Sequence, residues 1–176
     1  MSQKVMEGSA GKIHVRQVVR VGLLVALSAV GAHIKIPSIT GTPALDSLPG
    51  YFAAAALGWR EGALVAALGH LLTALTAGFP LSLPIHLLIA AEMGICALVF
   101  GYLFKKTNPV IAMGAAIILN GVGAPASLIP MMGPGIFYGL VTPLLVASAL
   151  NIIAAALLAK APGINRIFKG EEHAHY

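Results

Sequence analysis

Six apolar segments follow one another along the chain, and this succession constrains the fold more than any other feature. Proline, glycine and short charged stretches separate the segments, which are Val18–Ile34, Leu48–Leu57, Ala63–Ala77, Leu83–Phe104, Val110–Leu128 and Ile136–Ala159. With 58% hydrophobic residues, 10% charged residues and a mean hydropathy of +0.89, the chain is more apolar than a soluble domain of 176 residues. The sequence therefore predicts an all-α integral membrane protein with six transmembrane helices.

The second and third segments are too short to cross about 30 Å of hydrocarbon as untilted helices. Either they are buried among longer neighbours, or one of them is re-entrant. If all six segments cross, every one of the 11 Lys and Arg except Lys35 falls on one side, which the positive-inside rule makes cytoplasmic. We therefore expect both termini in the cytoplasm. Residues 1–17 then form a cytoplasmic N-terminal segment, 18–159 the membrane domain and 160–176 a cytoplasmic tail.

Polar side chains inside the apolar segments are candidates for binding. A charge at the centre of a membrane helix costs about 2.5–3.5 kcal/mol, so it normally faces a protein interior or a watery cavity. Glu92 lies near the middle of the fourth segment, and His86 lies in its first turn, about 120° away around the helix. The other candidates lie in or beside the outer half of the expected topology: Asn120, Tyr138, His33, Asp46 and Tyr51. Together they can line an outward-facing pocket.

Five of these candidates also have a structural interpretation. Glu92 can be a protonated acid bonded to a neighbouring helix, and Asn120 can form an interhelical hydrogen bond. Tyr138 can be an interfacial anchor, while His33 and Asp46 can be merely solvated.

Motifs of enzymes and of nucleotide-hydrolysing proteins are absent from the sequence. It contains no HExxH, no GxSxG and no P-loop, and its histidines show no metal-ligand spacing. His70 lies on a face of small residues, which favours helix packing, and Cys96 is the only cysteine. The basic residues are spread as topology signals, which argues against nucleic-acid binding. We expect no enzymatic activity, no cofactor and no metal site.

The block IPSITGTPALDSLPGYFAAAALGWREGALVAALGHLLTALTAGFPLSLPIHLLIAAEMG, together with the basic N-terminus and the layout of six short segments, resembles a known family. It is similar to the substrate-binding S components of energy-coupling factor (ECF) vitamin transporters, and most similar to the branch assigned to α-ribazole, a cobalamin precursor. The resemblance is strongest from Arg16 to Phe104.

The resemblance implies a location and partners. S components lie in the prokaryotic cell membrane and bind a vitamin from outside, under the loop that follows the first helix, here 36–48. A membrane scaffold subunit and two cytosolic ATPases energise them. Small residues on the first helix contact the scaffold, and the matching positions here are Gly22, Ala26 and Ala29. Internal packing of these residues remains an alternative.

The predicted ligand is α-ribazole. Its benzimidazole would stack on apolar walls, and its ribose hydroxyls would bond to Glu92, Asn120 and His86. Another vitamin or a nucleoside-like compound such as a queuosine precursor is an alternative. A small structural membrane subunit without a ligand is the alternative from another class.

Overall fold

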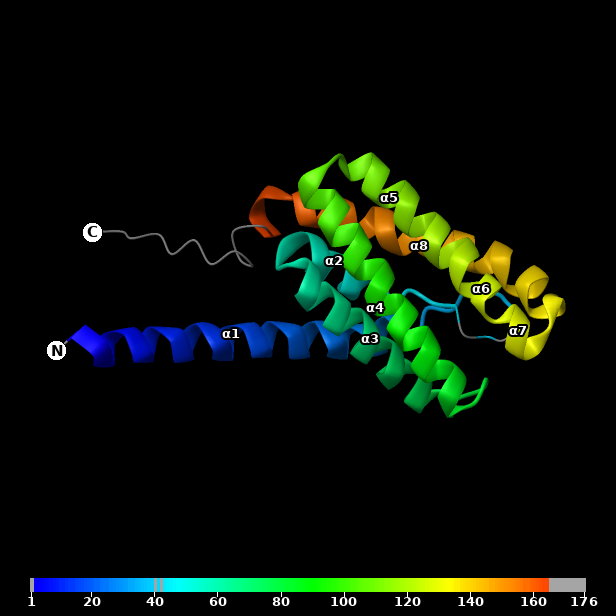
Figure 1. Ribbon diagram of the computed structural model, residues 1–176, viewed down its shortest axis with the longest axis horizontal. Helices are drawn as coiled ribbons and strands as arrows, with labels where there is room; N and C mark the ends of the chain where they lie inside the picture. The colour runs from blue at the N-terminus through cyan, green and yellow to red at the C-terminus, as the bar shows by residue number, and fades with distance from the viewer. Residues whose placement is uncertain (1, 40, 42, 165–176) are drawn as a thin grey trace.

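The computed structural model describes residues 2–39, 41 and 43–164, with side chains from Val15 onward. This part of the chain is helical, without a strand, and its isolated bridge joins Lys35 to Ala44. The elements in chain order are α1 (Ser2–Gly31), α2 (Leu48–Ala56), α3 (Trp59–Thr76), α4 (Leu83–Lys106), α5 (Pro109–Ile118), the π-helix η1 (Leu119–Gly123), α6 (Ala124–Ser127), α7 (Ile129–Met132) and α8 (Pro134–Lys160) (Figure 1).

Three stretches of the described chain are long and apolar enough to cross a membrane. They are Leu83–Lys106, Pro109–Met132, which joins α5 to α7, and Pro134–Lys160. These correspond to the fourth, fifth and sixth predicted segments. The first three predicted segments are not among these stretches. Length and hydropathy therefore support three of the six expected crossings.

The helix limits differ from the apolar segments mainly at the N-terminal side. The first helix begins at Ser2, within the predicted N-terminal segment 1–17, and ends at Gly31. Likewise α3 begins at Trp59 rather than Ala63, because helix formation does not require apolar residues in the first turn. Prolines lie in the first turn of α2, α4, α5 and α8. Proline is tolerated there because backbone N–H groups in the first turn have no hydrogen-bond partner within the helix.

Close packing of small residues joins α2 and α3 into a tight hairpin. A Cβ atom on Gly50 would lie 2.8 Å from the Cβ of Ala66, and one on Gly62 would lie 2.3 Å from the Cβ of Ala54, so neither glycine can be replaced without displacing the partner helix. Seven of the nine residues of α2 are buried, and α2 contacts α1, α3, α4 and α8. The second apolar segment is thus a short helix enclosed by longer neighbours.

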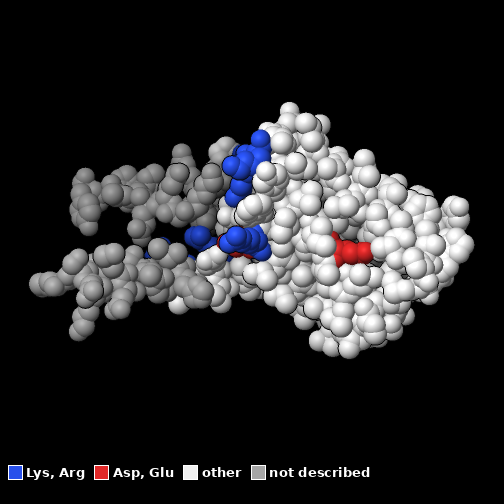
Figure 2. All heavy atoms as spheres, viewed as in Figure 1, with Lys and Arg blue, Asp and Glu red and all other residues white. Residues whose placement is uncertain are grey.

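The two ends of the helical bundle carry different connections. One end holds the α2–α3 turn, the α4–α5 turn and the end of α8, and the opposite end holds the α1–α2 and α3–α4 loops together with α6 and α7 (Figure 1). On the face shown in Figure 2, the basic side chains gather toward the first of these ends. This arrangement separates a charged end from an end built of proline-rich and glycine-rich loops.

Candidate functional site

A cavity of about 70 Å³ lies in the half of the bundle that holds the long loops. Its wall draws on the residues before α2 and on α3, α4, η1, α6 and α8, and most of it is aliphatic. The polar members of the wall are Asp46, Ser47, His70, His86 and Asn120. Five side chains that can form hydrogen bonds therefore converge on one apolar space, which is the usual composition of a small-molecule site.

Two histidines from neighbouring helices form a hydrogen-bonded pair in this wall. Nε2 of His70 on α3 lies 3.1 Å from Nδ1 of His86 on α4, and the ring of Phe79 lies 5.7 Å from that of His86. The backbone N–H of Leu81 points to Nε2 of His86 at 3.5 Å. One proton arrangement satisfies both contacts: Leu81 donates to His86, and Nδ1–H of His86 donates to His70. The pair is then neutral and polar.

The π-helix η1 places Asn120 in the wall. Its backbone closes by a bond from Ala124 N–H to the Leu119 carbonyl, five residues back, and such wide turns occur often at functional sites. Asn120 is buried, and its amide donates to the hydroxyl of Ser148 on α8 at 2.9 Å. That bond holds the side chain in place, while its carbonyl oxygen retains the capacity to accept.

The loop that precedes α2 forms one side of the cavity, and Asn151 of α8 holds it there. The amide nitrogen of Asn151 donates to the Ala44 carbonyl at 2.9 Å and to that of Ala147 at 2.8 Å, and its Oδ1 accepts from Leu48 N–H at 2.8 Å. The bond to Leu48 caps the N-terminus of α2, where Ser47 forms no side-chain cap of its own. One buried amide thus fixes both the loop and the start of α2.

Asp46, in the same loop, has a raised pKa. Burial away from water raises the pKa of this carboxyl group from 3.8 to about 6, and its backbone hydrogen bonds and the nearby charge of Lys35 oppose the shift only in part. The carboxyl group at the cavity wall is therefore a ready hydrogen-bond acceptor at neutral pH and a donor in mild acid.

Glu92 does not line the cavity. The cavity-facing residues of α4 are His86, Ile89 and Met93, and Glu92 occupies the adjacent face, beside Ser127 of α6. Its Oε2 is buried and has no hydrogen-bond partner in the described part of the chain. In Figure 2, acidic atoms lie within uncharged surface, apart from the basic end.

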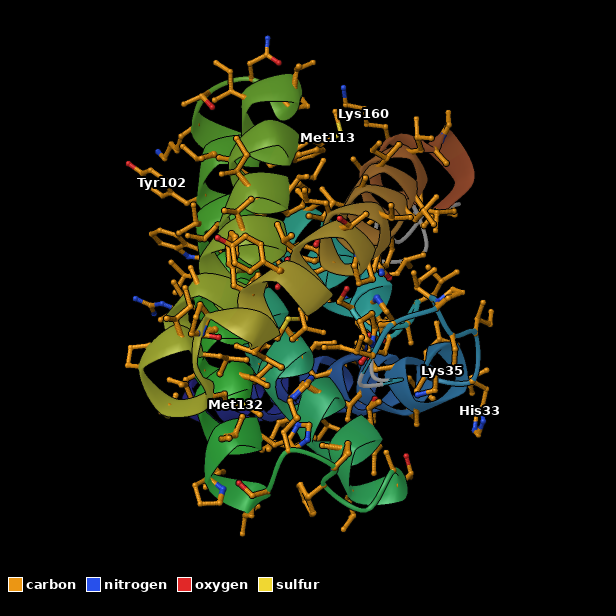
Figure 3. All side chains as sticks on the ribbon, turned by 90° about the vertical axis from the view of Figure 1, so that its right-hand side faces the viewer. His33, Lys35, Tyr102, Met113, Met132 and Lys160 are labelled. Atoms are coloured by element: carbon orange, nitrogen blue, oxygen red, sulfur yellow. The ribbon has the colours of Figure 1, made fainter. Side chains whose placement is uncertain are left out.

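The three remaining candidates also lie outside the cavity. Tyr138 on α8 is 75% exposed, and His33 points away from the bundle at the end of α1 (Figure 3). Tyr51 is fully buried in the core, where its ring packs edge-on against Phe100 at 5.4 Å, and its hydroxyl has no partner among the described residues. Of the seven sequence candidates, the cavity wall thus contains Asp46, His86 and Asn120.

Sequence reasoning missed three residues that shape the site. Ser47 and Asn151 are not among the sequence candidates, and the small-residue face around His70 predicts only helix packing. A signal for His70 was present, because a histidine in the middle of an apolar helix needs a polar partner. No sequence pattern shows that the partner is His86.

The small residues of α1 lie on its outer surface. Gly22 and Ala26 are exposed and Ala29 is partly exposed, and a Cβ on Gly22 would meet nothing within 4 Å. The face of α1 that packs inward carries Leu24 and Ser28 instead.

Comparison with known protein families identifies the chain. Residues 16–161 match the family described as "ECF transporter, substrate-specific component". The chain belongs to this family. No curated protein and no solved structure matches it. As an S component it is the substrate-binding subunit of a transporter, and it works in a membrane complex with scaffold and ATPase subunits rather than as an enzyme.

Proposed function

We propose that this S component binds a vitamin-like small molecule in the cavity between the α1–α2 loop, α3, α4, η1 and α8. The observation that carries the proposal is the convergence of five polar side chains from separate elements on one apolar cavity, in a chain of a substrate-binding family. Family membership supports the class of function, and the cavity supports the proposed location of the ligand.

The cavity must widen to accept such a ligand. Its volume of about 70 Å³ accommodates roughly two water molecules at about 30 Å³ each, whereas sites for small molecules measure about 300–1,000 Å³. The α1–α2 loop is a non-helical part of the wall, and side-chain hydrogen bonds from Asn151 hold it to α8. We infer that this loop moves outward to admit the ligand and returns over it.

The proposed ligand is α-ribazole. Its benzimidazole would lie against Ile89, Leu140 and Leu144, and its ribose hydroxyls would bond to Asp46, Asn120 and the histidine pair. Glu92 would join the site only if widening turns it toward the cavity. Another vitamin or nucleoside-like compound, such as a queuosine precursor, would use the same combination of apolar wall and hydrogen-bonding groups.

Mass spectrometry of the small molecules released from gently purified protein tests the proposal. We expect one heterocyclic compound in stoichiometric amount, and α-ribazole is then tested for binding to the purified subunit without ATP. His86→Ala should abolish binding, whereas His33→Ala, which alters an exposed histidine outside the cavity, should not. Absence of any ligand, together with unchanged thermal stability when candidate vitamins are added, would favour the purely structural subunit.

The proposed arrangement in the membrane follows the charges. We infer six crossings in a prokaryotic cell membrane, with residues 1–17 and 160–176 in the cytoplasm and 18–159 as the membrane domain. The exposed Gly22 and Ala26 then form the contact with the scaffold subunit, and Ala29 lies at its edge. Their exposure supports this role over internal packing.

A further inference from the structure

A second hollow lies at the opposite end of α4 from the cavity. It measures about 450 Å³ and is lined by the α2–α3 turn, the first turn of α3 and the last turns of α4, from Gly101 to Lys106. The distance along α4 from Met93, in the cavity wall, to Lys105 is about 18 Å at 1.5 Å per residue. The hollow is therefore separate from the proposed substrate site.

The hollow is strongly basic. Arg60, Lys105 and Lys106 line it, all three are exposed, and none has an ion-pair or hydrogen-bonding partner in the described part of the chain. Glu61 is the acidic residue of the wall, so three positive charges and one negative charge give a net +2. The Glu61 carboxyl group already accepts a hydrogen bond from Gln17 Nε2 at 2.5 Å and folds back toward Gly58. Within the described part of the chain, nothing therefore competes with an external anion for these three cations.

An aromatic pair borders the same hollow. Trp59 and Tyr102 stack with ring centroids 5.2 Å apart and an angle of 20° between the rings, and both are exposed. The side chain of Tyr102 points outward from α4 (Figure 3). Because Lys105 and Lys106 end a helix long enough to cross a membrane, the hollow lies at a membrane–water boundary in either orientation. Exposed Trp and Tyr side chains are typical of that depth.

Exposed apolar side chains continue from the hollow toward the centre of the membrane. On α4, Leu98 and Ile95 lie one and two turns before Tyr102 on the same stripe, and 39% and 57% of their surfaces are exposed. On α3, Leu64 and Leu68 follow Arg60 at intervals of four residues and are 55% and 47% exposed. The charged hollow and the apolar stripes together are complementary to a lipid that has a charged headgroup and apolar chains.

We propose that this hollow binds the headgroup of an anionic phospholipid. Arg60 and the two lysines hold the phosphate, with the Arg60 guanidinium able to bond two phosphate oxygens at once. The Trp59–Tyr102 pair packs against the glycerol backbone, and the acyl chains follow the apolar stripes of α3 and α4. Basic hollows at the ends of membrane helices favour anionic headgroups because each cation adds attraction at the surface.

Fluorescence of Trp59 gives a direct test, because it is the only tryptophan of the chain and it lies in the hollow. The full chain is reconstituted in phosphatidylcholine vesicles that contain increasing fractions of phosphatidylglycerol brominated on its acyl chains, and quenching of Trp59 is measured. Brominated phosphatidylcholine serves as the reference lipid. We expect about a tenfold preference for phosphatidylglycerol, since each cation near the surface contributes up to about a fivefold gain.

A charge-matched pair of variants provides the control. Lys105→Gln/Lys106→Gln should reduce the preference for phosphatidylglycerol to about twofold or less, because the hollow loses two surface cations. Lys35→Gln/Lys160→Gln removes the same charge from exposed positions outside the hollow and should keep the preference. A Trp59 emission spectrum equal to that of the parent chain shows that each variant has kept its fold at this site.

Three results would overturn the proposal. Equal quenching by the two brominated lipids would show that the hollow has no preference for an anionic headgroup. Displacement of the brominated lipid by saturating inorganic phosphate would assign the hollow to a soluble phosphate compound. Loss of scaffold co-purification in Lys105→Gln/Lys106→Gln, without any lipid preference in the parent chain, would assign it to a protein contact. Ligand binding at the distant cavity is measured separately. Failure of the lipid proposal can therefore be distinguished from failure of the proposed substrate site.

Discussion

At the scale of single residues, Glu92 shows that a shift of one position along a helix decides whether a side chain faces the cavity. Its neighbour Met93 lines the cavity, whereas Glu92 faces α6 with one carboxylate oxygen buried and without a partner in the described chain. A buried acceptor of this kind costs about 1–3 kcal/mol while it stays unpaired. A movement that opens the cavity can bring it to a ligand.

Glu92→Gln tests that movement. If the ligand bonds to Glu92 in the open form, the substitution should weaken binding by roughly 10- to 100-fold, the value of a charged hydrogen bond. Titration calorimetry with the identified ligand measures the change. Glu61→Gln, which removes an acid at the other end of the molecule, is the control and should leave affinity unchanged. Unchanged affinity in both variants would remove Glu92 from the site.

Asp46 predicts a pH dependence of stability. Its pKa is raised from 3.8 to about 6, so between these values the folded chain binds more protons than the unfolded chain. The free energy of unfolding therefore falls as the pH rises from about 4 to about 6, and the contribution of Asp46 is constant above that range. At 1.36 kcal/mol per pKa unit, the fall is at most about 3 kcal/mol. Asp46→Asn should be more stable than the parent chain at neutral pH and should lose this slope. Thermal unfolding in detergent across the pH range measures both, and an unchanged slope would contradict the assignment.

At the scale of elements, the side chain of Asn151 supplies hydrogen bonds that join α8 to the α1–α2 loop. Asn151→Ala removes the bonds to Ala44 and Leu48 and leaves buried polar backbone groups unpaired, which should cost about 2 kcal/mol of stability. The hydrogen-exchange rate of the backbone amides in residues 43–48 should also rise in this variant. Asn108→Ala removes the single cap bond of α5 and should cost about 1 kcal/mol without changing exchange in the loop. Equal exchange in the two variants would show that Asn151 does not hold the loop.

The outer face of α1 makes a separate prediction about assembly. Gly22→Leu adds a bulky side chain where the described structure leaves open space, so folding and ligand binding should persist while co-purification with the scaffold subunit is lost. Gly114→Leu makes the same change at an exposed, equally open position on α5. Retention of the scaffold by Gly22→Leu, or equal loss in both variants, would place the contact elsewhere.

At the scale of the whole molecule, the proposed topology places the two ends of the bundle on opposite sides of the membrane. After Cys96, the only cysteine, is replaced by alanine, Ile39→Cys and Thr107→Cys report the exposed α1–α2 loop and the α4–α5 turn. In intact cells a membrane-impermeant maleimide should label residue 39 and not residue 107. Labelling of both, or of residue 107 alone, would contradict six crossings with cytoplasmic termini.

The sequence by itself determined the class of molecule. The apolar segments, their breaks at proline and glycine, and the scarcity of charge depend on composition and spacing, so they predicted an all-helical membrane protein and the limits of α4 and α8 within two residues. The same layout resembled the family that the comparison confirmed. Depth along a helix also follows from spacing, and it predicted that His86, Asn120 and Asp46 share one half of the molecule, where the structure places them in one cavity wall.

Only the tertiary structure decided which polar groups meet. The rotation of each helix about its axis depends on packing with its neighbours, such as the contact of Gly50 with Ala66, and no single segment encodes it. That rotation turned Glu92 away from the cavity and brought His70 to His86. It also brought Asn151 to a loop more than one hundred residues away in the chain. A helix has a fixed rise per residue, but its facing direction is a property of the assembled bundle.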